Sequence, residues 1–289
     1  MKKKFSFSLS SLALKIIAAL LMTIDHIGLL FVPNSKETYT LYYILRAIGK
    51  IAFPIFAFLA VEGAYHTKNA KKYLLRLLLS AILLDGVGYL VGYLGKIRIA
   101  DNPIVGNAFM DMFLGVLTIT LLRKKNWYSL FALLPISYAV LSNVTVSADY
   151  GTLFKTDWGT FSIALFLCYF LAKELSSYLV RRKNSTSSGF DFEVYHLKYD
   201  KLLEIVALFT VELAFYLLYR IDYTSSFIPV EFVPIGSYSC LAALFLLFYN
   251  GRKGYDKKWI QYSFYVYYPL HLLILGILSL FFGVLSTMF

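Results

Sequence analysis

Residues 12–32 read LALKIIAALLMTIDHIGLLFV, and this stretch decides the fold class. The run has the roughly 20 mostly apolar residues that a helix needs to cross a bilayer. Asp25 and His26 interrupt it well inside the apolar stretch. An ionisable side chain at that depth is costly unless it faces a protein interior or a water-filled cavity. The two residues therefore indicate a candidate functional site within a membrane-spanning helix.

The whole chain has the composition of an integral membrane protein. Apolar residues make up 59% of the 289 residues and charged residues only 16%, far from the balance of soluble domains. Apolar runs recur from end to end, so we expect a single membrane domain over residues 1–289. The basic start at 1–4 resembles a signal peptide. However, the apolar run behind it is too long and lacks a cleavage site, which favours a retained first helix.

The expected fold is an all-α integral membrane bundle of about nine transmembrane helices around a polar central cavity. The fourth and eighth spans are short, which favours tilted, broken or re-entrant helices. Pro54 is expected to kink the second span, because proline cannot continue the helical hydrogen bonds. The expected spans are residues 12–32, 41–64, 73–95, 107–122, 127–147, 159–179, 202–222, 230–249 and 260–288.

Basic residues between the spans predict the orientation. The formal net charge is +11, and most of this charge falls in alternate loops. Because cytoplasmic loops are enriched in Lys and Arg, we expect a cytoplasmic N-terminus. Short basic clusters between apolar spans also favour membrane lipids, and not nucleic acid, as partners. The clusters are residues 2–4, 68–76, 123–125, 181–201 and 252–258, whereas the opposite loops carry Lys36, Lys96, Arg98 and Lys155.

Ionisable side chains of several spans lie at depths that allow them to meet. His26 lies roughly 9 Å, and Arg46 roughly 8 Å, below the outer membrane face along their helices. Lys50 follows Arg46 by one turn and shares its face. Asp25 and His26 point about 100° apart on a helix, so we expect His26 to face a cavity and Asp25 to pair with Arg46. Three further residues at compatible depths join the candidate site: Asp85, Asp111 and His271.

Several polar and aromatic residues also have purely structural interpretations. Buried polar contacts fix helix packing in many membrane proteins, and Asp85 and Asp111 could simply neutralise cations. Lys15 and Lys173 are expected to extend to the cytoplasmic surface. Residues 181–201 are expected to form a flexible connector. Interfacial anchoring is the expected role of Trp127, Trp158 and Trp259.

A second polar patch lies at the cytoplasmic end of the second span. Glu62 and His66 are one helical turn apart and can contact one another. Lys68, Lys71, Lys72 and Arg76 add positive charge beside this pair. This charge could hold an anionic ligand, or it could be an ordinary basic cytoplasmic loop.

Other chemistries lack their motifs in this sequence. It has no Walker-type loop, no Gly-rich dinucleotide turn and no zinc-ligand spacing, so we expect no metal cofactor. A histidine with carboxylates suits proton abstraction or a proton relay. The residues alone therefore do not decide between two function classes. One is an enzyme, and the other is a proton-coupled transporter or flippase that uses Asp25, His26 and Asp85. A non-catalytic scaffold for an envelope assembly is the third alternative.

Several segments of the chain resemble the TraX family. The most specific is residues 22–28, MTIDHIG, followed by residues 46–58, RAIGKIAFPIFAF. Weaker similarity follows at residues 148–151 and 267–272. The resemblance covers most of the chain, with little support in residues 175–235. It also includes Glu62-Gly63, His66-Thr67, Lys72-Tyr73 and Arg76-Leu77.

The resemblance implies a membrane-embedded acyltransferase in the cell membrane of a bacterium. Members resemble polytopic enzymes that use a membrane histidine and a cytoplasmic acyl-CoA donor, and the named member N-acetylates a conjugative pilin. We therefore expect acetyl-CoA or another acyl-CoA as the donor, with acetyl-CoA favoured, and an envelope glycan, lipid or peptide as the acceptor, modified at a hydroxyl or amine.

The resemblance also implies that His26 is the catalytic histidine, as general base on the acceptor or as carrier of the acyl group, and we favour the base. From the residues themselves, we expect Arg46 and Lys50 to stabilise the developing oxyanion or to orient Asp25. The acceptor is expected to contact Asp85, Asp111 and His271. The donor is expected to contact Glu62, His66, Lys71, Lys72 and Arg76.

Overall fold

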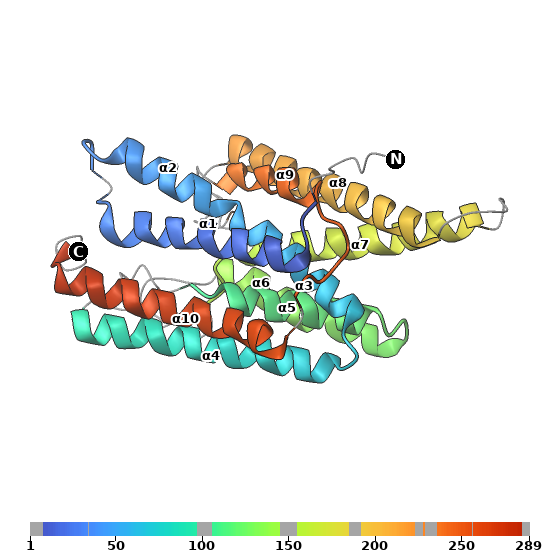
Figure 1. The fold of residues 1–289 in the computed structure, drawn as a ribbon, viewed down its shortest axis with the longest axis horizontal. Coiled ribbons are helices and arrows are strands. Elements are labelled where there is room, and N and C mark those ends of the chain that lie inside the picture. Colours follow the sequence, from blue (N-terminus) through green and yellow to red (C-terminus); the bar gives the residue numbers. More distant parts are fainter. Residues whose placement is uncertain are drawn as a thin grey trace.

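The computed structural model describes residues 8–33, 35–96, 106–144, 155–184, 192–222, 228, 236–255 and 257–284. Within these ranges the regular secondary structure is helical, apart from one isolated β-bridge between Leu9 and Tyr249. The long helices run side by side in an elongated bundle, and α10 lies along both α1 and α4 (Figure 1). The expected all-α architecture is therefore confirmed for the described residues.

The helices follow one another in the predicted order. Short 3-10 turns, labelled η, introduce two of them. The elements are α1 (Ser11–Phe31), α2 (Tyr39–Lys50), α3 (Ala52–His66), α4 (Ala70–Gly95), α5 (Ala108–Leu122), η2 (Trp127–Ala132), α6 (Leu133–Val144), α7 (Gly159–Asn184), α8 (Phe192–Ile221), η4 (Gly236–Leu241), α9 (Ala242–Leu246) and α10 (Lys258–Phe281).

Six helical segments in the described part of the chain are long and apolar enough to cross a membrane, which makes this a multi-pass membrane protein. Three shorter apolar segments, Ala108–Leu122, Trp127–Ser142 and Gly236–Leu246, fall where the other three spans were expected. The predicted positions are thus confirmed, whereas full crossing by nine helices is not. The six are Ser11–Phe31, Tyr39–His66, Ala70–Gly95, Gly159–Lys183, His196–Ile221 and Trp259–Phe281.

The second span is broken near its proline, as predicted. α2 ends at Lys50 and α3 begins at Ala52. At the break the N–H of Ile51 donates to the carbonyl of Ile48, with an N–O distance of 3.4 Å. Pro54 has no N–H for the carbonyl of Lys50, and its ring crowds that carbonyl. The break therefore falls about one turn before the proline.

The span that contains α2 and α3 is the most enclosed of the six. In its most apolar window 67% of the residues are buried, against 28–44% in the other five. Ile55 and Val61 of α3 are fully buried. Since Arg46, Lys50 and Glu62 all lie on this span, the protein interior surrounds the predicted site residues.

Two glycines allow α1 and α2 to approach closely. A Cβ added at Gly49 would lie 2.0 Å from the Cβ of Asp25, and one at Gly28 would lie 2.8 Å from the Cβ of Leu45. Small residues at helix contacts let membrane helices pack backbone to backbone. This close contact brings Asp25 of α1 beside α2.

The Gly49→Ala variant is expected to unfold at a lower temperature than the wild type. The added methyl would overlap Asp25, and overpacking of this kind costs about 1–3 kcal/mol. Thermal unfolding in detergent measures the loss. Gly86→Ala is the matched control, because a Cβ at Gly86 of α4 meets no atom within 4 Å. Equal unfolding temperatures of the two variants would contradict this account of the contact.

The expectation of a flexible connector at residues 181–201 is wrong for most of that stretch. α7 continues to Asn184 and α8 begins at Phe192. Polar residues in the first turns of α8 are ordered because they form ion pairs with other side chains in the structure. His196 Nδ1, for example, lies 3.0 Å from Asp200 Oδ2.

Candidate functional site

His26 and His271 form a hydrogen-bonded pair inside the bundle. α1 supplies His26 and α10 supplies His271, and both side chains are buried. The Nδ1 atom of His26 lies 2.8 Å from the Nε2 atom of His271. The Nδ1 atom of His271 lies 3.0 Å from the carbonyl oxygen of Tyr267, one turn earlier on α10. The structure therefore brings together His26, the predicted catalytic histidine, and His271, one of the residues predicted to contact the acceptor substrate.

The hydrogen bonds of the pair assign the protons when both rings are neutral. A carbonyl oxygen can only accept, so His271 carries its proton on Nδ1 and donates it to Tyr267. Nε2 of His271 is then an acceptor, and Nδ1 of His26 must be the donor to it. This leaves the lone pair on Nε2 of His26. A neutral imidazole nitrogen with a free lone pair is the atom that general-base catalysis requires.

A buried group of charged residues lies on α1 and α2. Nη1 of Arg46 lies 2.5 Å from Oδ2 of Asp25, which confirms the expected pairing of these two residues. Lys50 is 4% exposed, and its ammonium group lies 5.4 Å from the ring centre of Trp158. Trp158 also stacks on Phe53, with ring centres 4.8 Å apart. Arg46 and Lys50 are both buried, as their shared helix face predicts.

Trp158 is therefore no interfacial anchor, and that interpretation is wrong. Its side chain is 3% exposed, whereas Trp127 and Trp259 are 63% and 66% exposed. The position just before α7 suggests an interface in the sequence. In the fold, however, the indole is enclosed by Lys50 and Phe53.

Asp111 holds the start of α7 next to this charged group. Its Oδ2 atom accepts hydrogen bonds from the backbone N–H groups of Asp157 at 2.8 Å and Trp158 at 3.0 Å. The first N–H groups of a helix have no partner within the helix, so a carboxylate there stabilises it. Burial raises the pKa of the Asp157 carboxyl, and the positive charges of Lys50 and Arg46 oppose that rise.

Asp85 takes part in the contact between α4 and α5. The side-chain amide of Asn107 donates to Oδ1 of Asp85 at 2.8 Å and to the carbonyl of Ala81 at 2.8 Å. The amide oxygen of Asn107 accepts from the N–H of Met110 and so caps α5. Of the three residues predicted to contact the acceptor, only His271 is hydrogen-bonded to His26.

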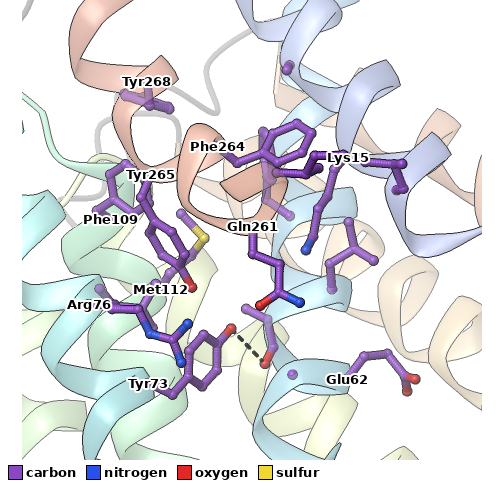
Figure 2. Close-up of a pocket in the computed structure, with 18 of the residues that line it drawn as sticks. Lys15, Glu62, Tyr73, Arg76, Phe109, Met112, Gln261, Phe264, Tyr265 and Tyr268 are labelled. Atoms are coloured by element: carbon purple, nitrogen blue, oxygen red, sulfur yellow. Dashed lines mark hydrogen bonds between the residues drawn. The ribbon is translucent and has the colours of Figure 1, made fainter. Parts of the chain in front are cut away.

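A cavity of about 500 Å³ opens beside the buried groups, a size that suits a small-molecule ligand. Four basic side chains line it: Lys15, Lys68, Arg76 and Lys253. They come from the start of α1, the end of α3, the start of α4 and the segment before α10, which meet at one end of the bundle. Figure 2 shows Lys15, Glu62 and Arg76 around this cavity.

The residues predicted to contact a donor divide into two groups. Glu62, His66 and Arg76 line the cavity. Lys71 and Lys72 are exposed and are not among its lining residues. The cavity instead takes positive charge from Lys68, which belongs to the predicted polar patch, and from Lys15 and Lys253, which the sequence alone did not assign to an anionic ligand. Their common feature is a position at the same predicted membrane face.

Two tyrosines of α10 separate the cavity from the histidine pair. Tyr267 and Tyr268 both line the cavity. The ring of Tyr267 stacks on His271 with centres 5.1 Å apart. The ring of Tyr268 meets His26 edge-on at 5.8 Å. His26 is not itself one of the lining residues, so in the described residues it contacts the wall of the cavity and not the open space.

A second buried ionic group involves Glu62 at the edge of the cavity. Lys173 of α7 forms a salt bridge with Glu62 and lies 2.8 Å from Oδ2 of Asp200 and 3.7 Å from Oε1 of Glu204. Lys173 is 5% exposed, so the expectation that it extends to the membrane surface is wrong. Its ammonium group is drawn inward by three carboxylates.

The spacing of the acidic residues on α8 is the feature of the sequence from which this ionic group around Lys173 could have been predicted. Asp200 and Glu204 are one helical turn apart, so they share a face of α8. That face had to be buried against another helix inside an apolar span, where unpaired acids are costly.

Within the described residues, no group of three or more His, Cys, Asp or Glu side chains is placed to hold a metal ion.

The fold and this interior define a polytopic membrane protein with a buried site of ionisable residues. The family model described as TraX protein matches residues 10–185 and 192–279, and the chain belongs to the TraX family. It is 26% identical over 269 residues to the probable fimbrial assembly protein FimC, serogroup H1, of Dichelobacter nodosus. That match covers 92% of this chain and 94% of the relative. No solved structure matches the chain.

Proposed function

We propose that this protein is a membrane-embedded acyltransferase of the bacterial cytoplasmic membrane. It transfers an acyl group, with acetyl-CoA as the donor, to a hydroxyl or amine of an envelope-associated or secreted acceptor. One observation carries the proposal: a single cavity has basic side chains at one end and, deeper in the bundle, two tyrosines that contact the histidine pair.

The basic end of the cavity suits the phosphate groups of coenzyme A. Charge-assisted hydrogen bonds from Lys and Arg to phosphate are among the stronger polar contacts in proteins. Lys15, Lys68, Arg76 and Lys253 line this end, which the distribution of basic loops predicts to face the cytoplasm. Acyl-CoA is made in the cytoplasm, so the donor would enter there without crossing the membrane.

The histidine pair suits the chemistry of the transfer. Nε2 of His26 takes the proton of the acceptor as its oxygen or nitrogen attacks the thioester carbonyl. The new carbon–oxygen or carbon–nitrogen bond forms, the carbon–sulfur bond breaks, and His26 returns the proton to the departing thiolate. His271 fixes the tautomer of His26 through the 2.8 Å hydrogen bond. Arg46 and Lys50 are buried, Arg46 pairs with Asp25 next to His26 in the chain, and their positive charges favour a developing oxyanion.

The acceptor is an envelope glycan, lipid or peptide. The relative from Dichelobacter nodosus carries the name of a fimbrial assembly protein. This name supports a peptide acceptor that becomes part of a surface filament. Comparison of the acetylated envelope peptides, glycans and lipids of wild-type and deletion strains by mass spectrometry would identify the class.

Replacing both Lys68 and Lys253 with alanine is expected to raise the KM for acetyl-CoA by about 10-fold or more, because each charge-assisted contact to a phosphate is worth about 1.5–3 kcal/mol. The measurement is release of coenzyme A by the purified protein in lipid nanodiscs. The double replacement of Lys71 and Lys72 is the control, since it removes the same charge from outside the cavity.

Three outcomes would count against the donor site. Failure of the wild-type protein to bind or hydrolyse acetyl-CoA would overturn the proposed function. An unchanged KM in the Lys68 and Lys253 variant would remove the basic end of the cavity from the donor site. Equal changes in both double variants would show that the effect is one of overall charge and not of contact.

A further inference from the structure

We propose that Phe109 sets the length of the acyl chain that this protein accepts, and that its donors are short-chain acyl-CoA thioesters. The inference rests on the acyl transfer proposed above and names the substrate class of the same site. It follows from an aromatic wall, which we define as Phe109, Tyr265 and Tyr268.

The aromatic wall lies along one side of the cavity. Phe109 comes from the first turn of α5, whereas Tyr265 and Tyr268 come from α10, and all three line the cavity. The ring of Phe109 stacks on Tyr265 with centres 6.1 Å apart and meets Tyr268 edge-on at 5.3 Å. Figure 2 shows Phe109 and Tyr265 side by side, with Tyr268 at one end of the group.

The position of Tyr268 places this wall where the thioester must react. Its ring lies 5.8 Å from the ring of His26 and 5.4 Å from that of His271. With the donor phosphates at the basic end of the cavity, the thioester reaches Tyr268, the residue of the cavity wall that contacts His26. The carbon atoms beyond the thioester must then occupy space next to Tyr268 and Phe109.

The rings of the wall are closely packed. Phe109 is 5% exposed and Tyr268 is 7% exposed. Protein interiors pack about as densely as organic crystals, so two buried rings in contact cannot turn aside without displacing their neighbours. Met22 and Phe53, which are also buried, line the cavity as well. An acyl chain of a few carbon atoms fits such a site, whereas a long chain must displace an aromatic ring.

A long chain also cannot continue past Tyr268. The rings of His26 and His271 lie 5.8 and 5.4 Å from that of Tyr268, and Asp25, which precedes His26 on α1, forms a buried ion pair with Arg46. Inserting a hydrocarbon chain among buried charges would remove their polar partners, which is costly. Steric closure and polarity therefore limit the chain length together.

The test compares Phe109→Ala with the wild-type protein on acetyl-, butyryl-, hexanoyl- and octanoyl-CoA. We measure kcat/KM for coenzyme A release and the binding of each donor by competition with labelled acetyl-CoA. The wild type should prefer acetyl- over hexanoyl-CoA by about 10-fold or more, because even one methylene too many costs that much in a closed pocket. Phe109→Ala should reduce this preference by about 10-fold, since it removes the ring from the wall.

Phe113→Ala is the matched control. Phe113 lies one turn further along α5, is half-buried, and does not line the cavity. This variant loses the same ring from the same helix and should keep the wild-type preference. Phe109→Leu is a second variant that keeps the interior filled, and it should shift the preference in the same direction by a smaller factor if Phe109→Ala does not fold.

The outcomes separate this inference from the acyl transfer itself. Transfer from acetyl-CoA with equal rates on long chains in the wild type would overturn the chain-length limit alone. So would an unchanged preference in folded Phe109→Ala or Phe109→Leu protein, or an equal shift in Phe113→Ala. A wild-type protein that binds no acyl-CoA of any length would overturn both proposals.

Discussion

Replacing His26 with alanine will lower the rate of acyl transfer by about 10²- to 10⁴-fold, the usual contribution of a positioned general base. The variant loses the imidazole nitrogen whose lone pair is left free by the hydrogen bond to His271. Donor binding should change by only a few-fold, because His26 does not line the cavity. Single-turnover release of coenzyme A, together with equilibrium binding of acetyl-CoA, separates the two effects.

Two further histidine variants sharpen this test. His271→Ala should lower the rate by a smaller factor, about 10- to 100-fold, because His26 remains but loses the group that fixes its tautomer. His196→Ala is the control, since His196 lies on α8 and does not line the cavity. Full activity of the His26→Ala variant in the cell would exclude His26 as the base.

The Lys173→Met variant will be destabilised by about 3–5 kcal/mol, the usual cost of removing one partner from a buried ion pair. Methionine matches the length of the lysine stem but leaves Glu62, Asp200 and Glu204 without their shared cation. Both oxygens of Glu204 already lack a hydrogen-bond partner among the described residues. The free energy of unfolding in detergent, measured by chemical denaturation, gives the size of the effect.

Lys125→Met is the matched control for Lys173. Lys125 also pairs with a glutamate of α7, with its ammonium group 2.8 Å from Glu174, but its side chain is 69% exposed. Exposed ion pairs contribute about 0–1 kcal/mol, so this variant should unfold almost like the wild type. Lys173→Arg should retain most of the stability, because it keeps the charge. Equal destabilisation by both methionine substitutions would show that the burial of Lys173 is unimportant.

The helices and their order could be predicted from the sequence because apolar length is a local property. The pairing of Asp25 with Arg46 could also be predicted, since consecutive spans are usually neighbours and the two residues have similar depths. The break near Pro54 follows from the chemistry of proline alone. Each of these features depends on one helix or on two consecutive helices.

Contacts between distant helices could not be predicted in the same way. In the sequence, Lys173 has the position of a surface lysine near the end of a span. Only the packing of α7 against α3 and α8 shows that its side chain faces three carboxylates. Lys15 and Lys253 come together in the cavity from segments far apart in the chain. The interpretation of Trp158 was wrong for the same reason, since its neighbours Lys50 and Phe53 belong to α2 and α3, far from it in the chain.

The separation of the two histidines along the chain has a consequence for biosynthesis. His26 and His271 are 245 positions apart, so the first helix cannot form this pair until α10 has been translated and inserted. A chain that stalls or is truncated before α10 lacks Tyr267, Tyr268 and His271 together. Under the proposed mechanism, such a molecule would therefore be unable to consume the cell's thioesters.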